Sequence, residues 1–406
     1  MKNPSFFDGF DPFALIQTYG SPLYVYRESI FRERCREMMR LVTYPNFSVN
    51  YSVKANTNLT LLKIAREEGL HADAMSPGEI YVEKAAGYTS PEIFFISNNA
   101  SAEELRFAVD QGIMVSIDSI SQLALYGRTF PHTKVALRIN SGVGAGHSDK
   151  VVTGGHKTKF AILEKQLDEA LAIINQYDLT VAGLNQHIGS FVLDPETYLS
   201  GVRALLPIAM RFKDLEFIDL GGGFGMPYQA GQPRLDLKEL GEALDVLLYD
   251  FAKNYGRMVQ FKIEPGRYIS AECCVLIGTV NALKSNGDDL YCGTDLGFNN
   301  LIRPVLYDAY HEVETLPKRE GAPVHPYNVV GNICESGDIV AAERPLPEMK
   351  EGDLVVVYDT GAYGYSMSSQ YNNRLRPAEV LLGEDGQVKL IRRRDTLEDL
   401  LRNFEV

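Results

Sequence analysis

Residues 46–58, NFSVNYSVKANTN, place a lysine at the end of a hydrophobic run and directly before a turn. The run FSVNYSV predicts a strand, and ANTN supplies the turn that ends it. We therefore expect Lys54 at the carboxyl-terminal tip of a buried strand. Such a lysine is a salt-bridged core residue, a phosphate ligand or a reactive amine, because Lys is rarely buried without a partner.

Seven further apolar runs follow this strand, with amphipathic stretches between them. The eight predicted strands span residues 47–54, 70–74, 93–97, 113–118, 134–140, 181–189, 217–223 and 261–267. Helical spacing of apolar residues predicts helices over residues 59–69, 77–87, 102–112 and 165–177. Such alternation indicates parallel β/α units, and eight strands close a TIM-type (β/α)8 barrel. An open, doubly wound sheet is the alternative.

The ends of these predicted strands carry the polar residues that chemistry needs. They are Lys54, Asp73, Asn98, Asp118, Asn140, His187, Gly221–Gly223, Glu264 and Arg267. In a barrel the carboxyl ends of all strands converge on one mouth, where active sites lie. In an open sheet the same residues would spread along an edge, so the pattern favours the barrel.

The pattern of predicted secondary structure changes after residue 270. Short strand-like runs alternate with Gly- and Asp-rich turns, and GEDGQ at residues 383–387 is typical of a hairpin. We predict a barrel domain over residues 27–270 and a C-terminal all-β domain over residues 271–406. SPLYVYRES at residues 21–29 is strand-like, so the N-terminal residues 1–26 are expected to join the β-rich domain.

Composition excludes several classes of protein. The 406 residues carry a net charge of −13, which argues against nucleic acid or an anionic membrane as the main partner. We find no apolar run near transmembrane length and no signal-peptide pattern, and we predict a cytoplasmic protein. The five cysteines form no CxxC pair, so neither a zinc site nor a disulfide framework is expected.

Two glycine-containing motifs at the last two predicted strands indicate a phosphate site. DLGGGFG at residues 219–225 lets backbone N–H groups approach an anion, and EPGR at residues 264–267 adds a guanidinium fork. Barrels of this class often bind phosphate with the loops after strands seven and eight. A tight turn and a structural ion pair are the alternatives.

QHIGS at residues 186–190 ends the sixth predicted strand. His187 can stack on an aromatic ring and Ser190 can donate to a phosphate, although a satisfied core histidine is the alternative. A phosphate cradle, an imidazole, a carboxylate and an amine at one mouth are the parts that pyridoxal 5′-phosphate requires. Lys54 would hold this cofactor covalently, and Glu264 would pair with its pyridinium nitrogen.

The motifs, in their order along the chain, resemble those of the fold-type III pyridoxal-phosphate decarboxylases, which share an alanine-racemase-like fold. The resemblance is strongest to the diaminopimelate decarboxylases and covers residues from about 20 to about 400. It rests on YSVKAN, HIGS, GGGFG, EPGR, RPVLYDAYHE, CESGD and GAYGYSMSSQYN. It implies a homodimer whose two active sites are shared between the subunits.

The resemblance also implies a role for each matching residue. Lys54 matches the cofactor-bearing lysine, His187 the residue that stacks on the ring, and Cys334 a proton donor from the partner subunit. Glu264 matches the pyridinium partner. Further cofactor contacts are implied for Asp73, Gly189, Ser190, Gly221, Gly222, Gly223, Gly266, Arg267 and Tyr363.

Substrate contacts are implied for a smaller set. Arg303 and Tyr307 match the pair that binds a distal carboxylate, with help from Arg267, and Glu335 matches the residue that binds a distal ammonium. Tyr363 is expected to reach the substrate as well. Because such a set suits a zwitterionic far end, we predict decarboxylation of meso-diaminopimelate to L-lysine and CO2. A surface salt bridge is the alternative for Arg303.

Other functions stay open at this point. Asn185 stands where the family often has His, and Asn332 where Pro is common. Either departure suits a decarboxylase of a citryl-diaminopropionate siderophore intermediate or of carboxynorspermidine. An alanine-racemase-like isomerase and a non-catalytic, inhibitor-like homologue are further alternatives. The Gly-rich residues 144–160 are interpreted as a mobile lid, and His147 and His156 lack a third ligand, so no metal is expected.

Overall fold

The computed structural model describes residues 6–146, 155 and 158–405. The chain divides into two compact units. Unit 1 contains the described residues of Met1–Phe31, Pro227–Gln232 and Ser270–Val406, and unit 2 contains those of Arg32–Met226 and Pro233–Ile269. The domain limits 27–270 and 271–406 stay predictions, and they did not anticipate that Pro227–Gln232 groups with unit 1.

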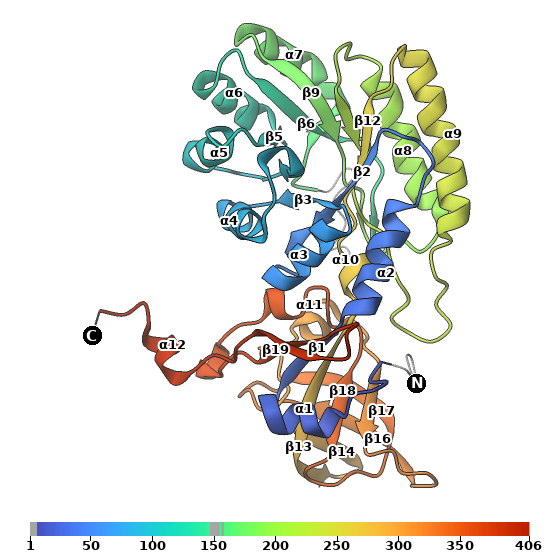
Figure 1. Cartoon of the computed structure of the whole chain (residues 1–406), viewed down its shortest axis with the longest axis vertical. Helices are drawn as coiled ribbons and strands as arrows, with labels where there is room; N and C mark the ends of the chain where they lie inside the picture. The colour runs from blue at the N-terminus through green and yellow to red at the C-terminus, as the bar shows by residue number, and fades with distance from the viewer. Residues whose placement is uncertain (1–5, 147–154, 156–157, 406) are drawn as a thin grey trace. The chain divides into compact units, whose positions relative to one another are not determined.

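Unit 2 is built on a closed barrel of parallel strands (Figure 1), and the predicted barrel is confirmed over the open sheet. Pairing between β5 and β6 closes the ring. Each strand overlaps one of the eight predicted segments. In order around the barrel they are β5 (Met114–Ile117), β4 (Ile93–Phe95), β3 (His71–Ala74), β2 (Phe47–Ser52), β12 (Gln260–Ile263), β11 (Phe217–Asp219), β9 (Thr180–Asn185) and β6 (Lys134–Asn140).

Helices follow the strands and surround them in Figure 1. Local sequence explains where several begin, because a Ser, Asn or Asp side chain accepts a hydrogen bond from a first-turn N–H. Ser76 caps α4 in this way, and Asn58 caps α3. The helices of this unit include α3 (Leu59–Glu67), α4 (Pro77–Ala86), α5 (Ala102–Val109), α6 (Ile120–Thr129), α7 (Leu167–Gln176), α8 (Pro195–Ala209) and α9 (Leu237–Tyr255).

Unit 1 is built around an extended sheet. Its strands run in the order β17 (Ile339–Pro347), β16 (Val324–Val330), β14 (Asp289–Thr294), β13 (Cys274–Asn286), β1 (Leu23–Arg27), β19 (Ala378–Leu382) and β20 (Val388–Arg392). β18 (Leu354–Val357) pairs with β13 and with β15 (Val313–Leu316). The N-terminal strand β1 lies between β13 and β19.

The hairpin predicted at GEDGQ is confirmed, because β19 and β20 pair antiparallel on either side of it. This unit carries short helices beside its strands. They include α1 (Pro12–Tyr19), α11 (Arg303–Tyr307) and α12 (Leu397–Leu401). Its core includes Leu23, Val25, Val275, Ile277 and Val380.

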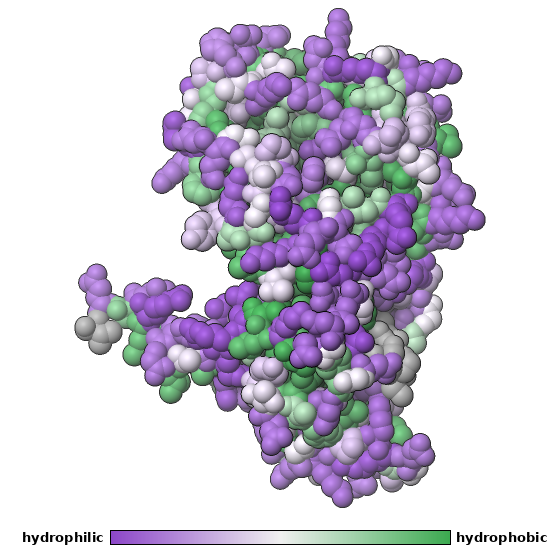
Figure 2. Space-filling view, in the orientation of Figure 1, coloured by the Kyte–Doolittle hydropathy of each residue, from purple (hydrophilic) through white to green (hydrophobic). Residues whose placement is uncertain are grey.

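Hydrophilic residues cover much of the face drawn in Figure 2. Among the described residues, no helix has both the length and the apolar character needed to cross a membrane.

Candidate active site

Lys54 lies where the sequence placed it, on the short 3-10 turn Val53–Ala55 that directly follows β2. Its Nζ is 4.0 Å from Met75 Sδ. The charge of its amine acts on the carboxyls of Asp73 and Glu264 and on the imidazole of His187. The ends of β2, β3, β9 and β12 therefore bring an amine, two carboxyls and an imidazole together at the barrel mouth.

Asp73, on β3, fixes the backbone next to Lys54. The carboxylate is buried; its Oδ2 accepts a hydrogen bond from Ser52 Oγ at 2.8 Å and its Oδ1 accepts one from the Val53 N–H at 3.2 Å. Burial raises the pKa of Asp73, while the positive charge of Lys54 opposes that shift. Asp73 thus holds the residue that precedes the lysine and supplies negative charge close to its amine.

His187 follows β9 and is held by a backbone donor. The Gly222 N–H donates to His187 Nδ1 at 3.2 Å, so the proton of the neutral ring lies on Nε2. Burial, together with the positive charges of Lys54 and Arg138, places the pKa of His187 well below its usual value. The side chain is therefore a neutral imidazole, which suits stacking on an aromatic ring.

The three consecutive glycines after β11 are pressed against neighbouring backbone. A Cβ at Gly221 would lie 2.2 Å from the Gln186 carbonyl oxygen, and one at Gly222 would lie 2.1 Å from the Glu264 carbonyl oxygen. Gly223 has φ +107°, and a Cβ there would lie 2.9 Å from the Gly189 carbonyl oxygen. The loop therefore accepts no side chain, and its backbone lies against the ends of β9 and β12.

A cation and a hydroxyl lie near the same glycine loops. Nε and Nη2 of Arg267 donate to Ser190 Oγ at 3.2 and 3.1 Å, and the guanidinium is buried. Gly266 packs beside the lysine turn, since a Cβ there would lie 2.8 Å from Ser52 Cβ. Gly189, Ser190, Gly266 and Arg267 are thus brought to the same end of the barrel as Lys54.

Glu264, directly after β12, forms a buried carboxyl pair with Asp219. The two side chains share a hydrogen bond. Burial raises the pKa of Glu264 well above its usual value, with the charges of Asp219 and Asp73 adding to the shift, and burial raises the pKa of Asp219 to about 6. Burial and the neighbouring carboxyls therefore favour the protonated form of Glu264, and a cation beside it would favour the carboxylate.

Sequence reasoning missed several charged residues of this cluster. Arg138 on β6 is buried, and its positive charge acts on Glu264, Asp118 and Asp73. Lys262 on β12 lies with Nζ 4.3 Å from the ring centroid of Phe217. The sequence feature that could have identified both residues is a charged residue in the middle of an apolar strand, as in KVALRIN and FKIEP.

Glu83 on α4 was also missed. Its side chain is fully buried, and neither carboxyl oxygen has a hydrogen-bond partner among the described residues. Burial, with the negative charges of Asp73 and Glu79, raises the pKa of Glu83 to about 9. At neutral pH it is a neutral acid near Asp73, and it adds no further negative charge to the cluster.

Arg303, one of the predicted site residues of unit 1, begins α11 and is 2% exposed, so it is not the surface salt bridge that was the alternative. Its Nη1 lies 2.8 Å from His311 Nε2, and its guanidinium lies 4.6 Å from the ring centroid of Tyr228. Tyr307, at the end of the same helix, is half-buried.

The remaining predicted residues of unit 1 lie on loops. Cys334 and Glu335 are exposed on the loop between β16 and β17. Tyr363 is half-buried and has φ +57°. His147 and His156, with most of the proposed lid, lie outside the described residues. Among the residues described, no three His, Cys, Asp or Glu side chains are placed to hold a metal ion.

The barrel cluster fits pyridoxal phosphate on two structural observations. Glu264 Oε1 is buried and has no hydrogen-bond partner among the described residues, so an acceptor is left for a pyridinium N–H. Gly221–Gly223 present close-packed backbone free of side chains, and Arg267 and Ser190 lie near them. Such a combination is suited to a phosphate group.

Comparison with known proteins agrees with this geometry. Residues 28–271 match the family model for the pyridoxal-binding domain of pyridoxal-dependent decarboxylases. Diaminopimelate decarboxylase of Methanothermobacter thermautotrophicus is 40% identical over 407 residues, covering 98% of this chain and 95% of that protein.

Solved structures give the same result. A crystal structure of diaminopimelate decarboxylase superposes with a TM-score of 0.89 at 35% identity, covering 96% of this chain and 94% of that one. The enzyme from M. jannaschii in co-complex with L-lysine has a TM-score of 0.89 at 31% identity, covering 98% and 95%. The chain belongs to the pyridoxal-dependent decarboxylases and, among them, to the diaminopimelate decarboxylase family.

Proposed function

We propose that this protein is a pyridoxal-phosphate-dependent carboxy-lyase that converts meso-diaminopimelate to L-lysine and CO2. The observation that carries the proposal is the Lys54 amine beside Asp73, Glu264 and a neutral His187 at the mouth of a parallel barrel. The similarity to diaminopimelate decarboxylases along nearly the whole chain supports the choice of reaction.

The barrel residues divide the binding of the cofactor among them. Lys54 Nζ would be the nucleophile that holds it, His187 would pack on its ring, and Glu264 would pair with the ring nitrogen. Ser190, Gly221–Gly223 and Arg267 receive the phosphate. When bound, pyridoxal phosphate supplies the electron sink that lets CO2 leave the α-carbon.

Protons are handled by groups of this chain. Glu264 would pass its proton to the ring nitrogen, and the resulting pyridinium cation would stabilise the carboxylate against the shift that burial and Asp219 impose. Cys334 of the partner subunit donates a proton to the α-carbon, at the position that CO2 has left. The S–H bond breaks, a C–H bond forms, and the electron pair of the S–H bond stays on sulfur.

Residues of unit 1 bind the far end of the substrate. Arg303 and Tyr307, with Arg267, take the distal carboxylate, Glu335 takes the distal ammonium, and Tyr363 borders the substrate. Arg303 suits this role because its guanidinium is already oriented by His311 and Tyr228 and needs little rearrangement on binding. The relative from M. jannaschii was crystallised with L-lysine, the product expected here.

We further propose a cytoplasmic homodimer with shared active sites. Cys334 and Glu335 are exposed in the single chain, as residues that serve a partner's site would be. Leu397, Leu401 and Phe404 are 68%, 59% and 68% exposed, and Figure 2 shows green atoms on this C-terminal segment. Such apolar exposure suits burial against a second copy. The five free thiols suit a reducing compartment.

The test is a substrate comparison with purified protein loaded with pyridoxal phosphate. We expect rapid, stoichiometric formation of L-lysine and CO2 from meso-diaminopimelate. Citryl-diaminopropionate and carboxynorspermidine, the alternative substrates, should react far more slowly. Faster turnover of either alternative would overturn the assignment of the substrate but leave the reaction class intact.

A further inference from the structure

The loop that carries Cys334 and Glu335 is clamped by the turn at residues 371–373. Asn372 Oδ1 accepts a hydrogen bond from the Cys334 N–H at 3.0 Å, and Asn372 Nδ2 donates to Cys334 Sγ at 3.2 Å. The Tyr371 hydroxyl donates to Glu335 Oε1 at 2.7 Å. Two consecutive residues of the turn therefore bind two consecutive residues of the loop.

The orientation of the Asn372 amide follows from its partners. A backbone N–H can only donate, so the amide oxygen must face Cys334 N and the amide nitrogen must face the sulfur. A thiol sulfur is a weak acceptor as well as a weak donor. With one lone pair of Sγ held by Asn372, the S–H bond is directed away from the turn.

Both partners of this contact are held in place. Asp338, buried at the end of the loop, accepts hydrogen bonds from the Ile333 and Phe298 N–H groups at 2.8 and 2.7 Å. The Phe298 ring stacks on Tyr371 with centroids 5.6 Å apart. Phe298 thus links the loop, through Asp338, to the turn, through Tyr371.

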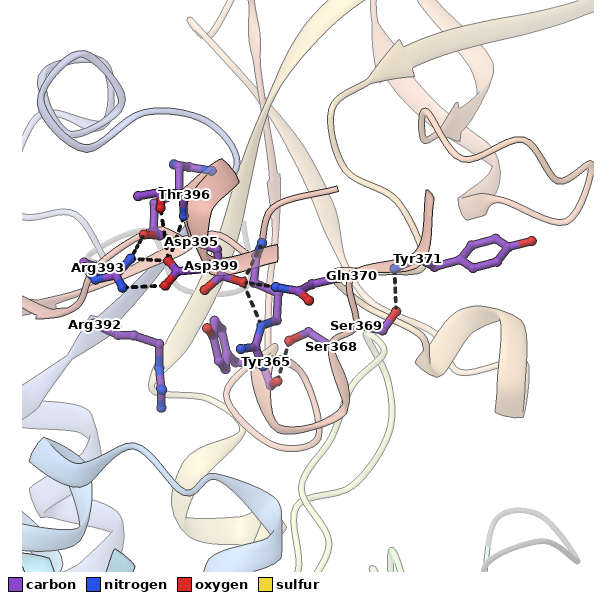
Figure 3. A network of polar contacts seen from close by, with 12 residues as sticks. Tyr365, Ser368, Ser369, Gln370, Tyr371, Arg392, Arg393, Asp395, Thr396 and Asp399 are labelled. Atoms are coloured by element: carbon purple, nitrogen blue, oxygen red, sulfur yellow. Dashed lines mark hydrogen bonds and ion pairs between the residues drawn. The ribbon is translucent and has the colours of Figure 1, made fainter. Parts of the chain in front are cut away.

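The C-terminal segment ties down both ends of the turn. Asp395 Oδ2 accepts from Gln370 Nε2 at 2.7 Å and from Arg376 Nε at 3.1 Å. Figure 3 shows the Gln370 amide bonded to Asp395 and the Tyr371 ring pointing away from that network. Gln370 and Arg376, which flank residues 371–375, are therefore both bound by the carboxylate of Asp395.

We propose that Asn372 is a positioning residue that orients the Cys334 thiol as a proton donor, and that Asp395 holds the turn that carries it. The inference rests on the proposed function, in which Cys334 protonates the α-carbon in the partner's site. As the S–H bond breaks, its electron pair remains on sulfur, and the Asn372 Nδ2–H then donates to a thiolate. Hydrogen bonds to a charged acceptor are the stronger kind, so the contact favours proton release.

The chain offers a matched control next to Asn372. Asn372 and Asn373 have φ of +55° and +53°, a conformation that glycine adopts without strain. Asn373 makes no hydrogen bond to Cys334 in the part of the chain that is described. Asn372→Gly and Asn373→Gly therefore make the same change in the backbone, and only the first removes the sulfur contact. Asn372→Asp is a second, isosteric variant that keeps the acceptor and replaces the donor.

Two readouts separate positioning from general damage. For Asn372→Gly and Asn372→Asp we expect kcat to fall about 10- to 100-fold, as for loss of a hydrogen bond to a charged group, with KM changed less than about threefold. Alkylation of Cys334 by iodoacetamide should slow, because the thiolate loses its donor. Asn373→Gly should stay within about twofold of the unchanged protein in both readouts. The other four thiols are buried, so the alkylation reports on Cys334.

Equal effects of the glycine variants on kcat and alkylation would overturn the proposal, as would an effect of Asn372→Gly on KM alone. Failure of the unaltered holoenzyme to form lysine would instead overturn the proposed function. The alkylation comparison needs no substrate, so the two failures are distinguishable.

Discussion

Glu83 makes the stability of this protein depend on pH in a direction opposite to that of most surface carboxylates. Its side chain is fully buried, neither oxygen is hydrogen-bonded among the described residues, and its pKa is about 9 against a reference of 4.5. The folded protein therefore keeps a proton that the unfolded chain gives up. The contribution of this proton to the free energy of unfolding is fully present below about pH 4.5 and is lost progressively as the pH rises toward 9.

The size of the effect follows from the two pKa values. At pH 7 the unfolded carboxyl is ionised and the folded one is neutral, which costs about 3.4 kcal/mol relative to acidic pH. At pH 5 the same cost is only about 0.8 kcal/mol. The difference, about 2.6 kcal/mol, holds for any folded pKa well above 7, because Glu83 is then neutral in the native state at both pH values.

Glu83→Gln isolates this contribution, because Gln is isosteric with the protonated acid and does not titrate. We expect the free energy of unfolding of the variant, minus that of the unaltered protein, to rise by about 2.6 kcal/mol between pH 5 and pH 7. The measurement is urea unfolding of the cofactor-free protein, followed by circular dichroism at a fixed protein concentration.

Glu103→Gln is the control, since it makes the same chemical change at an exposed position of α5. It should show no such rise. A stability difference for Glu83→Gln that is the same at both pH values would mean that Glu83 is ionised in the folded protein, and the reasoning from its burial would be wrong.

Three further predictions concern the active site. Lys54→Ala should abolish the visible absorbance of the lysine-bound cofactor while leaving the thermal unfolding of the cofactor-free protein nearly unchanged; an unaltered spectrum would remove Lys54 from its role. Cys334→Ala should lower kcat by at least about 100-fold, as for loss of a general acid, with the cofactor still bound, and equal turnover would exclude the thiol as the proton donor. Tyr371→Phe removes the hydroxyl that orients Glu335 and should raise KM for meso-diaminopimelate about three- to tenfold with little change in kcat, as for loss of one neutral hydrogen bond. A kcat effect without a KM effect would show instead that Tyr371 acts on the proton donor.

The barrel, and the end of it that carries the candidate site, could be predicted from the sequence because both follow from local patterns of residues. Alternation of apolar residues and the position of each turn predict a strand and where it ends, and these depend on residues close together in the chain. Lys54, Asp73 and Glu264 could therefore be assigned to strand ends, and the eight-strand count favoured closure. The hairpin at residues 383–387 was found for the same reason.

The protonation and the hydrogen-bond partners of each group in the site could not be predicted in this way. The pKa of Glu264 is raised because the residue is buried beside Asp219, 45 positions earlier in the chain. The pKa of His187 is lowered by burial and by the positive charges of Lys54 and Arg138. The contact of Asn372 with Cys334 joins residues 38 positions apart. The buried acid at Glu83 reads in the sequence as an ordinary helical glutamate.

The sequence alone determined which residue types stand at the ends of which strands, since the spacing of apolar and polar residues encodes local geometry. Only the tertiary structure decided which of those groups are charged and which are oriented. Charge and orientation depend on desolvation and on partners brought close by folding, and neither is a property of a residue's neighbours in the chain.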